Sequence, residues 1–264
     1  MIRFRPLALA AGLALSALPF HLAVAAPDAT AIVKDSDAAM KPQTEKTSYR
    51  MTLLNTDGSV EQVRTFTTYY HRGKGEERTL QKFLSPPVLA ETGLLIVEAG
   101  QPETETWLYL PTNRRIRRVA GQDKSNRYMG TEFSYEDFED YRMPYYRFQT
   151  VGEKRDQKGR DCWVIDAVAA APAQIAATGY ARKQYWIDKK SLYPVRVEYY
   201  AKDQQLEKVF TVHTLRAVGR YWRPESEEIR NVRTGKVTKL DILSNEIDIP
   251  LDERYVSQRY LRGD

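Results

Sequence analysis

Hydrophobic and polar residues alternate along most of this chain with a period of two residues. Tyr49, Met51 and Leu53 are separated by Arg50 and Thr52, which is the pattern of a strand with one buried face. Short runs of β-branched and aromatic residues predict further strands in the same way. These predicted strands span residues 60–70, 76–84, 94–97, 106–110, 145–155, 160–169, 181–188, 193–201, 205–216, 226–232 and 236–243.

The predicted strands are joined by short turns. Asp57-Gly58 is a strong hairpin signal. Pro86-Pro87 ends a strand, because proline cannot donate to the hydrogen-bond ladder. The Ala/Pro-rich stretch 169–179 is interpreted as a loop or a loose insertion. The pattern predicts one mainly β domain, a curved antiparallel sheet of about nine to twelve strands, and not a series of βαβ units.

Two helices are predicted outside this pattern. Residues 26–46 are expected to form an N-terminal helix or tail. A second, short helix is expected to begin at Ser134, an N-cap residue that is followed three positions later by Asp137, as in a capping box. Phe133 and Phe138 stand at the two positions of a hydrophobic staple. We expect this helix to lie across one mouth of the curved sheet.

The first residues have the form of an export signal. Arg3 and Arg5 precede an apolar run over residues 7–22, and Ala23-Val24-Ala25 is a small-x-small cleavage site. A membrane anchor is the alternative, but the run is short for a span and no charged stop follows it. No cysteine stands at the cleavage point, so a lipid anchor is not expected. We therefore expect cleavage after residue 25 and a soluble, exported mature protein.

Charge and cysteine content narrow the class of protein. The 264-residue chain carries a formal net charge of +5, which falls to +3 when the two arginines of residues 1–25 are removed. This mild excess in an exported protein argues against a nucleic-acid partner. Cys162 is the only cysteine, so an internal disulfide is excluded, and its strand-like surroundings predict a buried, inert thiol.

Candidate catalytic chemistry is sparse. The alternative function is an exported hydrolase, which would use carboxylates for acid–base work, but capping and solvation explain these residues more simply. The candidate carboxylates are Glu132, Glu136, Asp137, Glu139 and Asp140. His71 and His213 have no second ligand type at metal spacing, and nucleophile-elbow, phosphate-loop and dinucleotide motifs are missing from the sequence. We expect no enzyme activity, no metal and no cofactor.

Four arginines form the sharpest charge cluster, namely Arg114, Arg115, Arg117 and Arg118. They can contact anionic lipid headgroups or phosphate, or an acidic partner protein. A simpler interpretation is a solvated edge strand whose charges discourage pairing with another sheet.

Several motifs in combination resemble the outer-membrane lipoprotein-sorting family of LolA-like proteins, and the resemblance covers residues 47–261. The motifs are Leu108-Tyr109-Leu110-Pro111, the arginines of 114–118, the stretch from Gly130 to Asp137, Tyr185-Trp186-Ile187-Asp188-Lys189, Leu192-Tyr193-Pro194-Val195-Arg196, and the ending from Ile249 to Leu261.

The resemblance implies an incomplete antiparallel β-barrel over residues 47–264, with small helices covering its concave side. It also implies a periplasmic carrier of lipid or lipoprotein, expected to be monomeric. Such a carrier would work with an inner-membrane transporter of the resistance-nodulation-division (RND) or MMPL type and with an outer-membrane acceptor. A non-carrying accessory subunit of an exporter, with a filled barrel, is the alternative.

A carrier of acyl chains needs an apolar concave surface that its own side chains leave partly unfilled. The clearest one-sided strands supply candidates for this surface, although the same residues could pack a closed core. Residues 104–110 and 182–188 carry large side chains on both faces, so the sequence does not determine which face of these strands points inward. The candidates are Tyr49, Met51, Leu53, Trp107, Tyr109, Val195, Val197, Tyr199, Phe210 and Val212.

Overall fold

The computed structural model describes residues 28–100, 104–139 and 143–264. The export signal that we predict over residues 1–25 lies outside the described residues. Within the described ranges, no helix has both the length and the apolar character needed to cross a membrane.

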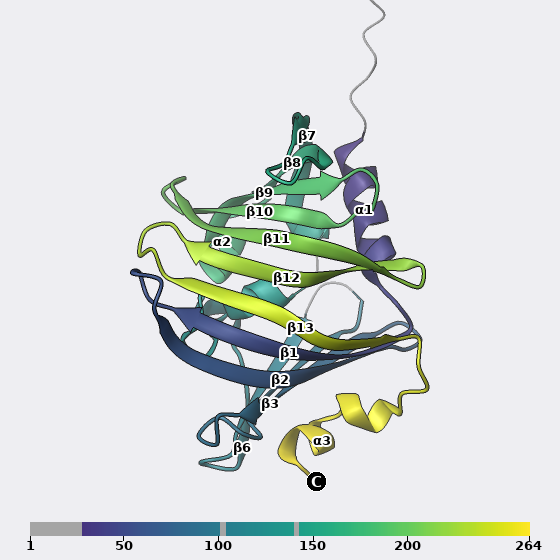
Figure 1. Cartoon of the computed structure of the whole chain (residues 1–264), viewed down its shortest axis with the longest axis vertical. Coiled ribbons are helices and arrows are strands. Elements are labelled where there is room, and N and C mark those ends of the chain that lie inside the picture. Colours follow the sequence, from purple (N-terminus) through teal and green to yellow (C-terminus); the bar gives the residue numbers. More distant parts are fainter. Residues whose placement is uncertain (1–27, 101–103, 140–142) are drawn as a thin grey trace, which may run out of the picture.

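A single antiparallel sheet of thirteen strands dominates the structure (Figure 1). Its spatial order is β6-β5-β4-β3-β2-β1-β13-β12-β11-β10-β9-β8-β7. The strands are β1 (Thr44–Leu54), β2 (Val60–Arg72), β3 (Glu77–Ser85), β4 (Gly93–Glu98), β5 (Thr104–Leu110), β6 (Arg115–Arg118), β7 (Tyr146–Arg155), β8 (Asp161–Ala169), β9 (Tyr180–Asp188), β10 (Pro194–Ala201), β11 (Leu206–Val218), β12 (Tyr221–Asn231) and β13 (Val237–Ile247).

The predicted antiparallel meander is confirmed. Hydrophobic alternation does not identify β6, which only the interpretation of the arginine cluster as an edge strand anticipated. Alternation works where one face is buried: in β1, Met51 and Leu53 are buried and Arg50 is exposed. Gly58 adopts the left-handed conformation (φ 83°) that the predicted hairpin turn requires. β6 has no comparable signal, because three of its four residues are exposed arginines.

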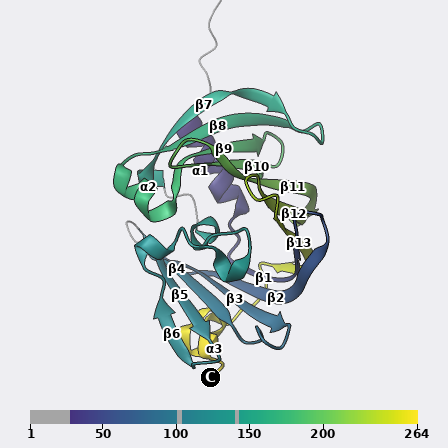
Figure 2. The ribbon, with the colours of Figure 1, turned by 90° about the vertical axis from the view of Figure 1, so that its left-hand side faces the viewer.

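The sheet curls but does not close, so β6 and β7 form two separate edges. Figure 2 shows the two halves of the sheet facing each other across a concave interior. The chain passes from one edge to the other through that interior. We call residues 119–139 the inner segment; it contains three short 3-10 helices, η1 (Gly121–Asp123), η2 (Tyr128–Gly130) and η3 (Tyr135–Phe138), and η4 (Met143–Tyr145) precedes β7. The expected incomplete barrel is thereby confirmed.

Small helices cover the concave side, as expected. The helix α1 (Ala29–Met40) is capped by the side chain of Asp28 and buries Ile32 and Val33 in the interior. The helix α2 (Pro172–Thr178) packs beside η1, β8 and β9. It replaces the loop predicted over 169–179, which was wrong: Pro172 starts the helix and Gly179, in the left-handed conformation, ends it.

The C-terminal residues add a helix that the sequence pattern does not anticipate. The 3-10 helix η5 (Glu253–Val256) and the helix α3 (Gln258–Arg262) pack against β2, β3 and β4. Val256 and Leu261 form a separate cluster with Leu80, Leu95 and Tyr109. Because Leu94 and Leu95 are neighbours on one strand and belong to different clusters, this cluster lies on the face opposite the concave interior.

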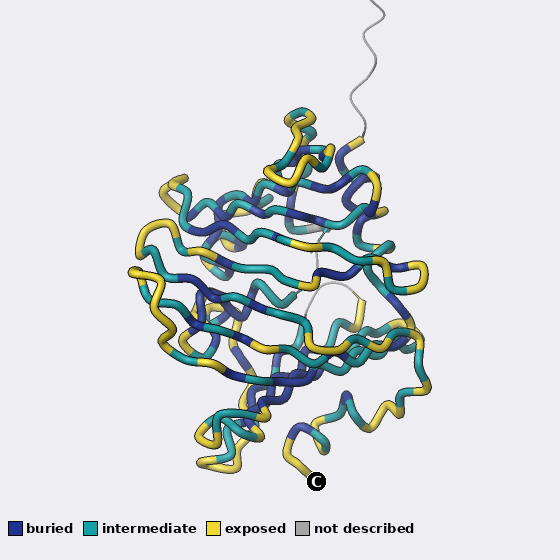
Figure 3. Tube along the Cα trace, viewed as in Figure 1, coloured by how far each residue is buried: buried dark blue, intermediate teal, exposed yellow. Residues whose placement is uncertain are grey.

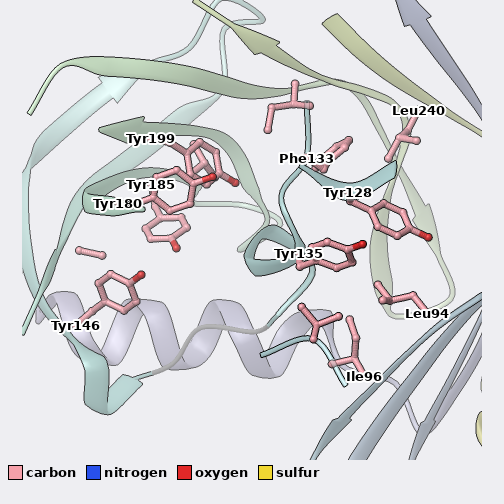
Figure 4. Packing of buried hydrophobic residues seen from close by; sticks show 14 of the residues in the cluster. Leu94, Ile96, Tyr128, Phe133, Tyr135, Tyr146, Tyr180, Tyr185, Tyr199 and Leu240 are labelled. Carbon is pink, nitrogen blue, oxygen red and sulfur yellow. The ribbon is translucent and has the colours of Figure 1, made fainter. Parts of the chain in front are cut away.

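The main core fills the space between the concave face, α1 and the inner segment. In Figure 3 the exposed residues concentrate in the turns at the strand ends, and the buried ones lie along the strands and inside the curve. Figure 4 shows Tyr128, Phe133 and Tyr135 of the inner segment packed near Leu94 and Ile96, above α1. The inner segment is therefore part of the core.

The predicted capped helix at Ser134 is a single 3-10 turn, η3. Ser134 and Asp137 form the expected capping box, in which the Ser134 amide donates to the Asp137 carboxylate at 2.7 Å. The rings of Phe133 and Phe138 lie 5.4 Å apart, as a hydrophobic staple requires. The hydroxyl of Ser134 is also within 3.2 Å of the Tyr180 hydroxyl on β9, so the turn is fixed to the sheet.

Removing the cap or the staple should destabilise the fold to different extents. Ser134→Ala loses the cap bond and should cost about 1 kcal/mol. Phe133→Ala leaves a cavity in the main core, where Phe133 is 5 % exposed, and should cost about 3–5 kcal/mol. Urea unfolding of both variants measures the difference. Equal, negligible losses would mean that the turn does not pack as described.

Candidate functional site

Two adjoining cavities open on the concave side beside α1. The first, of about 260 Å³, lies between the end of α1 and strands β1 to β4 and β12. The second, of about 210 Å³, lies between η3 and strands β9 to β11. Met40, Phe138 and Tyr193 line both cavities, so the two meet at these side chains. Together they reach the lower end of the range of about 300–1,000 Å³ that is usual for small-molecule sites.

The second cavity is slightly more apolar than the first, although Glu136, Asp137, Glu139 and Lys183 also line it. Val197 and Phe210 face each other across β10 and β11, and Tyr185 pairs with Val197 across β9 and β10. Figure 4 shows Tyr146, Tyr180, Tyr185 and Tyr199 gathered on this side of the interior. Such aromatic walls can contact an aliphatic chain along much of its length.

Buried ion pairs hold the inner segment against the strands. Lys208 on β11 pairs with Asp137 at 2.5 Å, and Lys183 on β9 approaches Glu136 at 3.5 Å. Lys124 and Glu139 pair at 2.7 Å within the segment and connect it to β5, because Lys124 donates to the carbonyl oxygen of Thr104 and Glu139 accepts from the Thr106 hydroxyl. The fourth pair joins Arg127 and Glu132 within the segment itself.

These pairs correct the interpretation of the carboxylates as capping and solvated groups. The side chains of Glu132, Glu136, Asp137 and Glu139 are at most 3 % exposed. Only Asp137 acts in capping. The segment runs through the interior and not over the surface, so its acids need buried cations as partners. Asp140, the fifth predicted carboxylate, lies outside the described residues.

The lysines that pair with these acids have strongly buried ammonium groups. Burial acts to lower the pKa of Lys183, but the charges of Tyr146, Tyr185 and Glu136 outweigh it and the net shift is upward. Lys183 therefore stays charged. Pairs of this kind commonly fix one arrangement of a core, whereas removing one partner is costly.

The first cavity contains a different set of charged groups. Lys41 lies 3.1 Å from Asp37 and 2.9 Å from Glu77, so it bridges α1 and β3. Arg223 on β12 donates to both carboxylate oxygens of Glu45 on β1. Both cations of this cavity therefore have acidic partners.

Glu227 of β12 also lines the first cavity, and its position is unusual. None of the hydrogen bonds and ion pairs of the described residues involves this side chain. Burial raises the pKa of its carboxyl group to about 8. Its charge in turn contributes to raising the pKa of Tyr49, for which burial is the larger cause, so the two side chains are neighbours.

The structure brings four of the ten predicted cavity residues to the cavities: Tyr49 to the first, and Val197, Tyr199 and Phe210 to the second. Met51 and Leu53 are buried in the main core. Trp107 and Tyr109 pack under the C-terminal helix on the opposite face. Val195 and Val212 form a small separate cluster with Cys162.

The predicted burial of Cys162 is confirmed, and burial raises the pKa of its thiol to about 12. Among the described residues, no group of three or more His, Cys, Asp or Glu side chains is placed to hold a metal ion.

The arginine cluster lies on the edge strand β6 and the turn before it. Arg114, Arg115, Arg117 and Arg118 are all exposed. Arg118 reaches Glu105 of β5 at 3.5 Å, a surface contact of little energetic weight. This position fits the interpretation of a charged edge strand, and a role in headgroup or partner contact stays a prediction.

Comparison with known proteins places the chain in a family. A family model described only as "Uncharacterized protein" matches residues 75–263, which is most of the chain, so the chain belongs to that family. No curated protein matches the sequence.

The fold is that of the LolA-like proteins, and the resemblance seen in the sequence is confirmed. A domain from Vibrio parahaemolyticus described as an outer membrane lipoprotein-sorting protein superposes with a TM-score of 0.80 at 25% identity, over 89% of this chain and 98% of that one. A DUF1329 family protein from Desulfovibrio piger matches with a TM-score of 0.80 at 24% identity, over 88% and 97%. A LolA superfamily protein from Nitrosomonas europaea matches with a TM-score of 0.67 at 16% identity, over 89% and 100%.

Proposed function

We propose that the protein is a periplasmic carrier that holds the acyl chains of a lipid or lipoprotein on its concave face for transfer toward the outer membrane. The observation that carries the proposal is the pair of cavities joined at Met40, Phe138 and Tyr193 inside an open sheet. The neighbour from Vibrio parahaemolyticus, described as a lipoprotein-sorting domain, supports this class of function. A periplasmic location rests on the export signal expected in residues 1–25.

The open sheet supplies what a carrier needs. Because β6 and β7 do not pair, the interior can be reached between the two edges without breaking a strand ladder. The second cavity offers aromatic and aliphatic walls, and the first adds polar groups at one end. An amphipathic ligand needs both kinds of surface. The donor is proposed to be an inner-membrane transporter of the RND or MMPL type.

One observation favours the alternative, an accessory subunit of an exporter that carries nothing. The inner segment occupies much of the interior and is fixed to β9 and β11 by two buried ion pairs. In an accessory subunit these contacts would simply complete a filled core. In a carrier, the cavities beside the segment bind ligand.

Blocking the junction of the cavities separates the two possibilities. Met40→Trp places an indole where the cavities meet and should weaken binding of an uncharged fluorescent acyl probe about tenfold, since losing two buried methylene contacts, about 0.8 kcal/mol each, is sufficient. Ala38→Trp is the matched control, because Ala38 is exposed on the same helix. Displacement titrations in which both variants bind like the wild type, or in which none of the three proteins binds, would contradict the carrier.

A further inference from the structure

Acidic residues outnumber basic residues in the lining of the first cavity, whereas basic residues outnumber acidic ones in the chain as a whole. Five carboxylates and two cations line it, whereas the chain has 40 basic and 35 acidic residues. The carboxylates are Asp37, Glu45, Glu77, Glu98 and Glu227. The wall of this cavity is therefore negative inside a mildly basic protein, which favours a positively charged ligand group.

The two cations are already committed to particular acids. Lys41 is placed between Asp37 and Glu77, and Arg223 donates to Glu45 and to the carbonyl oxygen of Met40. Glu98 also takes part in contacts within the protein. The carboxyl group that the described residues leave without a hydrogen-bond or ion-pair partner is that of Glu227.

Glu227 points into the cavity from the middle of the sheet. It lies opposite Leu240 on β13 and Val212 on β11, and Ile229, two residues along the same strand, is fully buried on the concave side. Tyr49 and Tyr193 also line the cavity, and the charge of Glu227 acts on both hydroxyl groups. The side chain is half-buried in the cavity wall and has no hydrogen-bond or ion-pair partner among the described residues, so a ligand group that supplies a partner is favoured.

We propose that the first cavity binds the ammonium group of an amphipathic ligand, with Glu227 as its counter-ion and the rings of Tyr49 and Tyr193 as its walls. Aromatic faces and a carboxylate together are the surroundings in which an ammonium group is held in a site shielded from water. The ligand's chain would pass Met40 and Phe138 into the second cavity. This inference rests on the proposed carrier function and adds the headgroup class to it.

A neutral oxygen acceptor is the competing ligand chemistry, because a protonated Glu227 could donate to an ester or phosphate oxygen. The two cases differ in proton balance. An ammonium group binds the ionised carboxylate, so its binding must release the proton that Glu227 carries at neutral pH. An oxygen acceptor keeps that proton in place. A phosphate would in addition face the acidic wall.

The experiment uses three probes with the same ten-carbon tail: decyltrimethylammonium, decanol and decanoate. Each is titrated calorimetrically into the full-length mature protein below its micelle concentration, in buffers that differ in ionisation enthalpy. The ammonium probe should bind about tenfold or more tightly than the other two, as expected for a cation held against aromatic faces beside a carboxylate. Its binding should release close to one proton at pH 7.

Variants of two neighbouring residues give the matched test. Glu227→Gln keeps the shape of the neutral acid and should remove both the preference for the ammonium probe and the proton release. Glu228→Gln should change neither, because Glu228 is the next residue of β12 and pairs with His213 and Arg230 outside the cavity.

The dependence on pH has one sign. As the pH is raised toward the pKa of Glu227, affinity for the ammonium probe should rise about tenfold per pH unit. Above that pKa the affinity should level off. The other titratable groups that line the cavity are Lys41 with Asp37 and Glu77, Arg223 with Glu45, the carboxyl of Glu98, and the phenols of Tyr49, Tyr70 and Tyr193. The Glu227→Gln variant should show a flat profile.

The experiment distinguishes failure of the ammonium site from failure of the carrier function. Equal binding of all three probes, or a Glu227→Gln variant that keeps the ammonium preference, would overturn the ammonium site and leave the carrier intact. No binding of any probe would overturn the carrier itself.

Discussion

Replacing Lys208 with methionine is expected to lower the free energy of unfolding by about 3–5 kcal/mol, the usual cost of leaving one partner of a buried ion pair alone. The side chains of Lys208 and Asp137 are 5 % and 1 % exposed. Lys208 also donates to the carbonyl oxygen of Glu132 at 3.2 Å, so its loss leaves two acceptors short of a donor. Urea unfolding at neutral pH measures the effect.

A surface pair provides the control. Lys236 pairs with Glu61 at 2.9 Å, and these side chains are 37 % and 45 % exposed. Lys236→Met should therefore cost about 0–1 kcal/mol. Equal losses for the two methionine variants would show that the inner segment is not held by buried charge.

Glu227→Gln is expected to stabilise the protein, and more so as the pH rises. Because burial raises the carboxyl pKa from 4.5 to about 8, the folded state holds a proton that the unfolded state has lost between these values. The stability of the wild type should therefore fall as the pH rises through this window. The variant has no proton to hold, so its advantage should reach roughly 3 kcal/mol at pH 7 and be under about 1 kcal/mol at pH 5.

Urea unfolding of wild type and variant across pH 5 to 8.5 compares the two directly, and other titrating groups cancel in the difference. Glu61→Gln should give a difference that hardly changes over this range, because the hydrogen bond from Lys236 lowers the pKa of this exposed carboxyl from 4.5 and Glu61 stays ionised. Parallel curves for wild type and Glu227→Gln would show that the fold does not raise the pKa of Glu227.

Much of the fold follows from alternation along the strands, and its failures have physical causes. Alternation identifies a strand when one face is buried, so β6, with its exposed arginines, gives no signal. The Ala/Pro-rich composition of 169–179 hides α2, although Pro172 and Gly179 are helix start and stop signals. The C-terminal helix α3 is short, and its docking depends on contacts with β4 that are distant in sequence.

The candidate site was predictable only in its apolar part. Val197, Tyr199 and Phe210 follow from alternation, but on β5 both faces are buried, and Trp107 and Tyr109 belong to the face that the C-terminal residues cover. The interior charges were missed because single charged residues are usually solvated. The sequence nevertheless contains a signal for these charges. Lys208 stands two residues before Phe210, and Glu227 two residues before Ile229, so each charged residue shares a strand face with an inward apolar side chain.

The central claim is that the concave face carries a lipid, and native mass spectrometry of the protein purified from the cells that naturally produce it tests this claim most directly. The carrier account predicts a species heavier than the chain by the mass of one lipid or acyl group, strongly reduced in Met40→Trp and retained in Ala38→Trp. A single species at the mass of the bare chain in all three proteins, under conditions that preserve a known lipid complex, would contradict it.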